Sequence, residues 1–177
     1  MTSVTDAETL FALYQDRLRR YLGRASGETE LARDLTQEVF LRVSRVAIPV
    51  APENQLAGWL FRIARNVALD HHRERNRRPE EALGTFDTMK GASQETTTAL
   101  NQALSTLPEL DRDVFLMREM SGLSYDEIAN ACELTPDAVR NRIHRARLQL
   151  REVLTTSLRP LRKRQIRPIR RPPRLTS

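Results

Sequence analysis

The feature that most constrains this chain is a pair of helix-start signals a dozen residues apart in residues 123–154. Ser124 can cap the first turn of one helix, and Glu127, three residues later, completes a capping box. Thr135 followed by Pro136 favours a second helix start, because a Thr N-cap and a Pro at the first helical position are pre-set for helix nucleation. The short turn between them predicts a helix-turn-helix, whose second helix can enter the DNA major groove.

The second of these helices has an apolar stripe and a basic face. Advancing about 100° per residue places four apolar side chains on one side of the helix, namely Val139, Ile143, Ala146 and Leu150. Residues 140–151 contain five Arg and no acid. Asn141, His144 and Arg145 point away from the stripe, and Arg and Asn suit base edges and phosphates. A solvated basic face on a core helix is the alternative, but the preceding capped helix and turn favour DNA binding.

The positive charge of the chain is unevenly distributed. The formal net charge is +6, yet residues 155–177 hold eight Lys or Arg and no acid, so residues 1–154 carry 21 basic and 23 acidic groups. Within that body, residues 62–78 form a second basic cluster with six Arg. Two separated basic elements predict two contacts with a polyanion. The Pro-rich tail 155–177 is expected to be disordered, serving either non-specific DNA contact or solubility.

The expected fold class is all-α, because apolar residues recur at three and four and strand-like alternation is absent. Helices are predicted from about Leu10 to Leu22, Glu28 to Val46 with Val46 buried, and Glu53 to Arg78. Shorter helices are predicted over 99–107 and 108–120, before the helix-turn-helix. The polar segment 79–98, between the third and fourth predicted helices, is typical of a flexible linker. We therefore predict two small helical domains, 1–78 and 99–154, which the linker 79–98 joins and which the tail 155–177 follows.

Several classes of function find no support in the sequence. The lone Cys132 excludes an internal disulfide and is expected to be a core residue. No run of eighteen apolar residues occurs, so no membrane insertion is expected, and a cytoplasmic location is predicted. No nucleophile, metal-ligand or phosphate-loop spacing emerges, so we expect no catalytic residue, cofactor or metal. His71 and His72 are adjacent on a helix and cannot chelate a metal jointly.

Three blocks of this sequence together resemble bacterial RNA polymerase sigma factors of the extracytoplasmic-function group, within the sigma-70 family. The blocks are DLTQEVFLRV at 34–43, WLFRIARNVALDHHRERNRR at 59–78, and LPELDRDVFLMREMSGLSYDEIANACELTPDAVRNRIHRARLQL at 107–150. Their order and spacing also match, over roughly residues 8–154. The resemblance implies a protein that binds the polymerase core, recognises the -10 and -35 promoter elements and assists promoter melting.

The resemblance also implies roles for particular residues. The first block is similar to the family's surface for the clamp helices of the largest polymerase subunit, which implies contacts by Asp34, Gln37, Glu38 and Leu41. The second block implies recognition of the -10 element as a single strand, with Asn66 at the pocket for a flipped-out base. It also implies that six arginines hold the backbone of the melting duplex and the displaced strand, namely Arg62, Arg65, Arg73, Arg75, Arg77 and Arg78. The helix-turn-helix implies recognition of the -35 duplex by Arg140, Asn141, His144, Arg145 and Arg147.

The implied partners are the polymerase core, including its clamp helices and flap region, and promoter DNA. Members of the family commonly have an anti-sigma protein, so one is a further candidate partner. This chain departs from many relatives at Asp137, where an acid beside DNA would be repulsive unless it complements the helix N-terminus. A stand-alone helix-turn-helix regulator, binding operator DNA as a dimer, is the alternative, but residues 1–98 offer no sensor or dimerisation segment. Trp59 is interpreted as a core anchor instead of a base-stacking residue.

Overall fold

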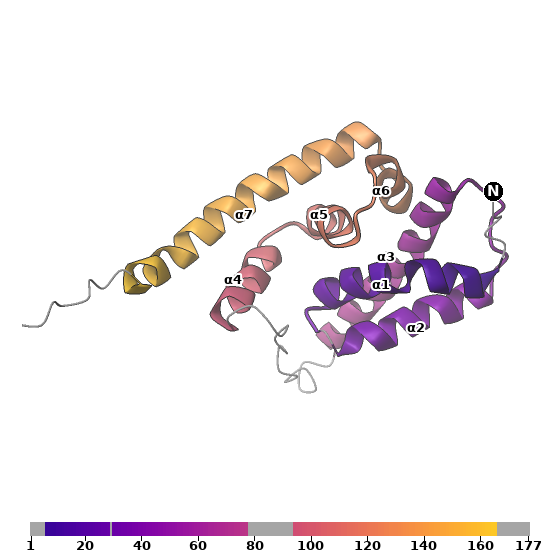
Figure 1. Ribbon diagram of the computed structural model, residues 1–177, viewed down its shortest axis with the longest axis horizontal. Coiled ribbons are helices and arrows are strands. Elements are labelled where there is room, and N and C mark those ends of the chain that lie inside the picture. Colours follow the sequence, from indigo (N-terminus) through magenta and orange to yellow (C-terminus); the bar gives the residue numbers. More distant parts are fainter. Residues whose placement is uncertain (1–5, 29, 78–93, 166–177) are drawn as a thin grey trace, which may run out of the picture.

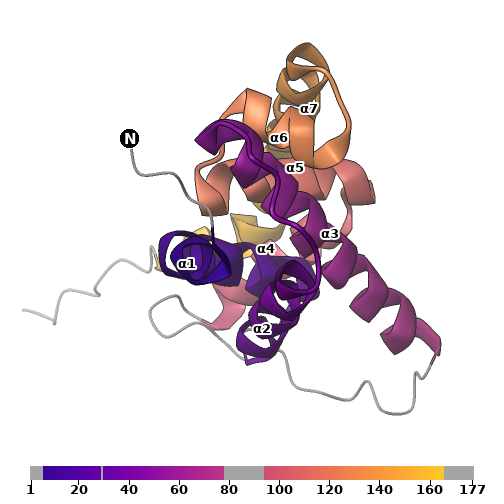
Figure 2. The ribbon, with the colours of Figure 1, turned by 90° about the vertical axis from the view of Figure 1, so that its right-hand side faces the viewer.

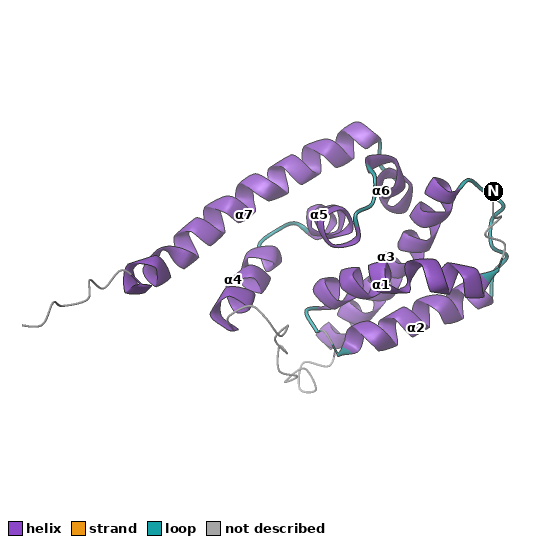
Figure 3. Cartoon of the chain, in the orientation of Figure 1, coloured by secondary structure: helices purple, strands orange, loops and turns teal. Residues whose placement is uncertain are grey.

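Every regular element in the described part of the chain is an α-helix. The computed structural model describes residues 6–28, 30–77 and 94–165, and Figure 3 shows helices joined by short loops over these ranges. In chain order the helices are α1 (Ala7–Ser26), α2 (Leu31–Ser44), α3 (Glu53–Arg77), α4 (Gln94–Ser105), α5 (Glu109–Ser121), α6 (Tyr125–Cys132) and α7 (Pro136–Gln165). The all-α prediction is confirmed, and none of the described helices has the length and apolarity that a bilayer span requires.

Local hydrogen bonds explain where the helices of the helix-turn-helix begin. The backbone N–H of Glu127 donates to Ser124 Oγ at 3.2 Å, and the backbone N–H of Ser124 donates to Glu127 Oε2 at 2.6 Å. These two bonds form the predicted capping box at the start of α6. The backbone N–H of Ala138 donates to Thr135 Oγ1 at 3.2 Å, which caps α7. Both predicted helix starts are therefore confirmed.

A single apolar core runs through the whole bundle. It includes Leu10, Leu18 and Leu22 from α1, residues of α2 and α3, and the predicted stripe of α7, whose four residues are at most 5% exposed. The prediction that Val46 is buried is wrong, since it is 51% exposed. Helix α2 ends at Ser44, so Val46 lies beyond the last turn and no longer follows the apolar stripe.

The helices form two units that pack against each other. Helices α1, α2 and α3 make up the first unit, and α4 to α7 make up the second (Figure 1). Figure 2 shows α3 passing beside α6, and α3 packs against α6 while α1 packs against α5. Helix α4 begins at Gln94, so residues 94–98 of the predicted linker are helical, while 78–93 lie outside the described residues. The domain boundaries stay a prediction.

The tail differs from the expectation in its first half. Helix α7 continues to Gln165, so residues 155–165 are helical and the prediction of disorder is wrong for them. Pro160 removes one helical hydrogen bond. However, α7 is nucleated well before this point, and propagation through Leu, Arg and Lys on either side is favourable. Residues 166–177 lie outside the described residues.

The capping box gives a stability prediction. Ser124→Ala removes the side-chain acceptor for the Glu127 amide and should lower the free energy of unfolding by about 1 kcal/mol. Ser44→Ala is the matched control, because Ser44 Oγ makes only an exposed bond to the carbonyl of Leu41 at the end of α2. Chemical denaturation of both variants measures the difference. Equal losses would contradict a specific role for the cap.

Candidate nucleic-acid interface

The predicted polymerase contacts share one outward face of α2. Asp34 and Gln37 are exposed, and Leu41 is 51% exposed although it is a large apolar side chain. Glu38 is bound to Arg42, whose Nε lies 2.9 Å from Glu38 Oε1. Helix α2 packs against α1 and α3, and Figure 1 shows it on the side of the molecule opposite α7. The first unit therefore presents acidic and apolar side chains on this face of α2.

Two of the predicted -10 contacts in α3 are instead bound to the second unit. Arg62 Nη2 donates to the carbonyl of Asn130 at 2.6 Å, and its Nη1 lies 3.5 Å from Glu133 Oε1. Arg65 Nε donates to Asp113 Oδ2 at 2.8 Å. Both arginines thus point at α5 and α6, because the same face of α3 that would bind DNA also covers the second unit.

The Arg65–Asp113 pair lies in the contact surface between the two units, where α1 and α3 pack against α5 and α6. We call this surface the seam. The Asp113 side chain is 5% exposed and the Arg65 side chain 22%. Tyr21 from α1 donates its hydroxyl to Asp113 Oδ1 at 3.2 Å. Burial raises the pKa of Asp113 although Arg65 beside it lowers that pKa, and burial raises the pKa of Tyr21 well above its usual value. A buried carboxylate therefore ties α1, α3 and α5 together.

The other predicted -10 residues are distributed along α3. Asn66 is exposed. Arg73 lies 3.7 Å from Asp70, and Arg75 lies 2.6 Å from Glu28. Arg77 is exposed at the end of the helix, while Arg78 lies outside the described residues. Asn66 is thus accessible next to arginines that already hold carboxylates.

The predicted -35 residues occupy the outward face of α7. Asn141 and His144 are exposed. Arg140 Nη1 lies 2.6 Å from Asp137 Oδ1 and its guanidinium stacks over the Tyr125 ring, with 5.5 Å to the centroid. Asp137 is in the first turn of α7, where an acid complements the helix dipole. The unusual acid therefore pairs with a neighbouring arginine.

Two further arginines of this face reach acids of α5. Arg145 Nη2 lies 3.6 Å from Asp111 Oδ2, and Arg147 Nη2 lies 2.6 Å from Glu119 Oε1. Arg142, which is not among the predicted contacts, also pairs with Asp111. Because Asp111 is only 6% exposed, it anchors α7 on α5 and fixes which face of α7 is turned outward.

Sequence reasoning missed Gly58, which sets the distance between α3 and α6. A Cβ atom on residue 58 would lie 2.5 Å from Asn130 Cβ and 2.8 Å from the carbonyl oxygen of Glu127. Both distances are shorter than normal contacts, so only glycine allows this approach. The one available signal was a glycine inside a predicted helix, which usually has a packing reason.

Two side chains that could have been functional are core residues. Cys132 Sγ lies 3.9 Å from Met117 Sδ, and burial raises the pKa of the thiol to about 12. Trp59 is partly buried against the apolar core. Their predicted structural roles are confirmed.

Comparison with known families gives a match on each unit. Residues 10–78 match the family model for Sigma-70 region 2, and residues 97–150 match the model for Sigma-70, region 4. Among similar proteins, the extracytoplasmic-function (ECF) RNA polymerase sigma factor SigE of Mycolicibacterium smegmatis is 36% identical over 163 residues, which cover 83% of this chain and 61% of SigE. The ECF RNA polymerase sigma factor EcfG of Rhodopseudomonas palustris is 32% identical, covering 77% of this chain and 78% of EcfG.

Solved structures show a similar fold. CnrH in complex with the cytosolic domain of CnrY matches with a TM-score of 0.63 and 25% identity, covering 85% of this chain and 88% of CnrH. The sigma factor RpoE in complex with the anti-sigma factor NepR from Bartonella quintana matches with a TM-score of 0.63 and 24% identity, covering 86% of this chain and 98% of RpoE.

The close approach at Gly58 predicts a variant that loosens the seam. Gly58→Ala forces α3 away from the Glu127 carbonyl, so we expect a destabilisation of roughly 1–3 kcal/mol and faster amide exchange in α6. Gly23→Ala makes the same chemical change inside α1 and should leave exchange in α6 unaltered. Hydrogen exchange read by mass spectrometry measures both variants. Unchanged exchange in Gly58→Ala would show that the two helices are already apart in solution.

Proposed function

This chain belongs to the extracytoplasmic-function group of the sigma-70 family of RNA polymerase sigma factors. On this basis we propose which of its surfaces binds the polymerase and which bind the two promoter elements. A sigma factor binds the polymerase core and directs transcription from specific promoters. In our proposal the face of α2 docks on the polymerase, α3 holds the melted -10 strand, and α7 reads the -35 duplex.

One observation carries this proposal. Asn66 on α3 and Asn141 and His144 on α7 are exposed, and these helices lie in the two regions that match the family. A flipped base costs a few kcal/mol to extrude, and an accessible amide can bond to its freed edge. Asn and Arg side chains on a groove-bound helix can bond to base edges of a duplex. Two separated base-contact sites support bipartite promoter recognition.

Arg62 and Arg65 require a change of arrangement before they can bind DNA. Both are bound to the second unit at distances of 2.6 and 2.8 Å, so we propose that the two units separate when the polymerase binds. Docking both units on one enzyme makes the second engagement intramolecular. The polymerase would then supply the affinity that opens the seam and would present both promoter contacts together.

The stand-alone regulator is not favoured. Residues 10–78 match a sigma region, which a dimeric operator-binding protein would not need. In our proposal the chain acts in the cytoplasm, where promoter DNA and polymerase meet, and it adds no catalytic group of its own. CnrH, a structural relative, was solved with a bound protein, and we include an anti-sigma protein as a further partner.

Polymerase docking is tested by reversing one charge on α2. With purified polymerase core and a library of genomic fragments, the chain should start run-off transcripts downstream of a shared bipartite element. Asp34→Arg should weaken core binding at least about tenfold, because it reverses a charge at a docking surface where complementarity sets affinity. Asp16→Arg, on the exposed side of α1, is the control. Equal core binding by both variants would show that this face of α2 does not bind the polymerase.

The two DNA contacts are tested by a pair of amide deletions. Asn66→Ala should slow promoter opening, read as permanganate reactivity of the -10 strand, and leave the -35 preference unchanged. Asn141→Ala should relax base preference in the -35 element by roughly tenfold, as expected for one lost base contact, without slowing the opening step. Each variant is the control for the other. The same defect in both would argue against separate roles.

A further inference from the structure

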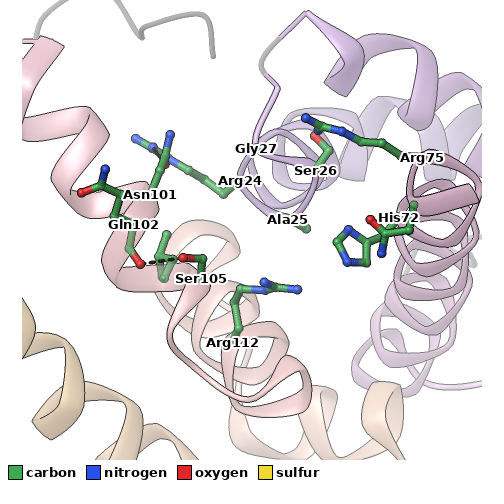
Figure 4. Close-up of a pocket in the computed structure, with 12 residues that line it drawn as sticks. Arg24, Ala25, Ser26, Gly27, His72, Arg75, Asn101, Gln102, Ser105 and Arg112 are labelled. Atoms are coloured by element: carbon green, nitrogen blue, oxygen red, sulfur yellow. Dashed lines mark hydrogen bonds between the residues drawn. The ribbon is translucent and has the colours of Figure 1, made fainter. Parts of the chain in front are cut away.

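A cavity of about 350 Å³ lies in the seam between the two units (Figure 4). The end of α1 and the last turns of α3 form one side, with Arg24, His72 and Arg75, while α4 and the first turns of α5 form the other, with Asn101 and Arg112. The volume is in the range of small-molecule sites. Arg75 is the one predicted DNA contact among the described residues that line it.

The lining of this cavity is strongly basic. Three Arg and one His line it together with amide and hydroxyl side chains, and within the described part of the chain no Asp or Glu does. Residues 1–154 carry slightly more acids than bases, so an acid-free lining with three guanidinium groups is a local exception. Such a lining favours an anion.

Existing contacts leave one buried donor of this lining unsatisfied. Arg75 is paired with Glu28 at 2.6 Å, and Arg24 Nη1 donates to the amide oxygen of Asn101 at 3.1 Å. Nε of Arg112 is buried, and among the described residues it has no hydrogen-bond partner. Figure 4 shows the Arg112 guanidinium extending from α5 toward the end of α3. A buried donor without an acceptor is costly, and an anionic oxygen in the cavity would satisfy it.

We propose that this cavity binds a small, multiply charged phosphate compound, which bridges the two units and holds them together. Guanidinium groups match phosphate oxygens in planar, two-bond geometry, and the volume admits a pyrophosphate or a nucleoside polyphosphate. Arg24 and Arg75 come from the first unit and Arg112 from the second, so the anion would bond across the seam. A ligand that binds only the closed arrangement stabilises it by mass action.

The consequence for promoter binding rests on the proposed function. The closed arrangement occupies Arg62 and Arg65 with contacts to the second unit, and the anion would also occupy Arg75. A bound phosphate compound would therefore oppose the opening that promoter binding requires. Anion binding itself needs neither polymerase nor promoter, so it can be tested separately from the sigma activity.

Titration calorimetry of the full chain with pyrophosphate tests the site. We expect saturable binding of one anion per chain, weakened at least tenfold by Arg112→Gln and unchanged by Arg33→Gln, which removes an exposed charge on α2. Asn101→Asp is a second variant that keeps the acceptor for Arg24 but adds a negative charge, and it should weaken binding to a similar degree. ATP in place of pyrophosphate distinguishes a nucleotide from the bare phosphate. Absent saturation, or equal binding by Arg112→Gln and Arg33→Gln, would overturn the proposal and leave DNA backbone attraction as the role of these arginines.

Hydrogen exchange tests the bridging. Saturating pyrophosphate should slow amide exchange in α6 of the Gly58→Ala variant several-fold, because it restores the contact between the units. If pyrophosphate binds but exchange in α6 stays the same, the anion does not bridge the seam and that part of the proposal fails.

Discussion

The close approach of α3 and α6 at Gly58 is the constraint on which the rest of this structure depends. Without a side chain at this position, α3 lies against the backbone of α6 near Glu127 and Asn130. This contact brings Arg62 within 2.6 Å of the Asn130 carbonyl, and Arg65 lies 2.8 Å from Asp113 one turn later. One glycine therefore determines whether these arginines face protein or solvent.

Carboxylates of the second unit bind several of the arginines that the proposed function assigns to DNA. Asp113 holds Arg65, Glu133 lies near Arg62, and Asp111 holds Arg142 close to Arg145. This explains why the body of the chain is slightly acidic although it carries two basic helices. The Arg62–Glu133 pair is exposed and individually weak, so a polyanion can replace it. The pair of Arg65 with the buried Asp113 is the stronger tie between the two units.

The sequence predicted features with local causes and missed those that depend on distant residues. The capping box at Ser124 and the Thr135 cap need only neighbours within three residues, and the stripe from Val139 to Leu150 follows from helical periodicity, so all were predictable. Asp113 lies 48 residues from Arg65, and no spacing rule connects them. The helix through Pro160 was missed because proline propensity was weighed without the long helix that precedes it.

The buried carboxylate of Asp113 decides how readily the two units part. Burial raises its pKa even though Arg65 and Tyr21 stabilise the charge. In the closed arrangement Arg65 and Tyr21 offset this burial cost by bonding to the carboxylate. When the units separate, Asp113 regains its hydration and Arg65 becomes available to phosphate, so the loss of this pair is compensated in the open arrangement. The apolar core that the two units share contributes to closure beside the ion pair. In the proposed function, a seam of this kind holds in the isolated chain and opens when the polymerase binds both units.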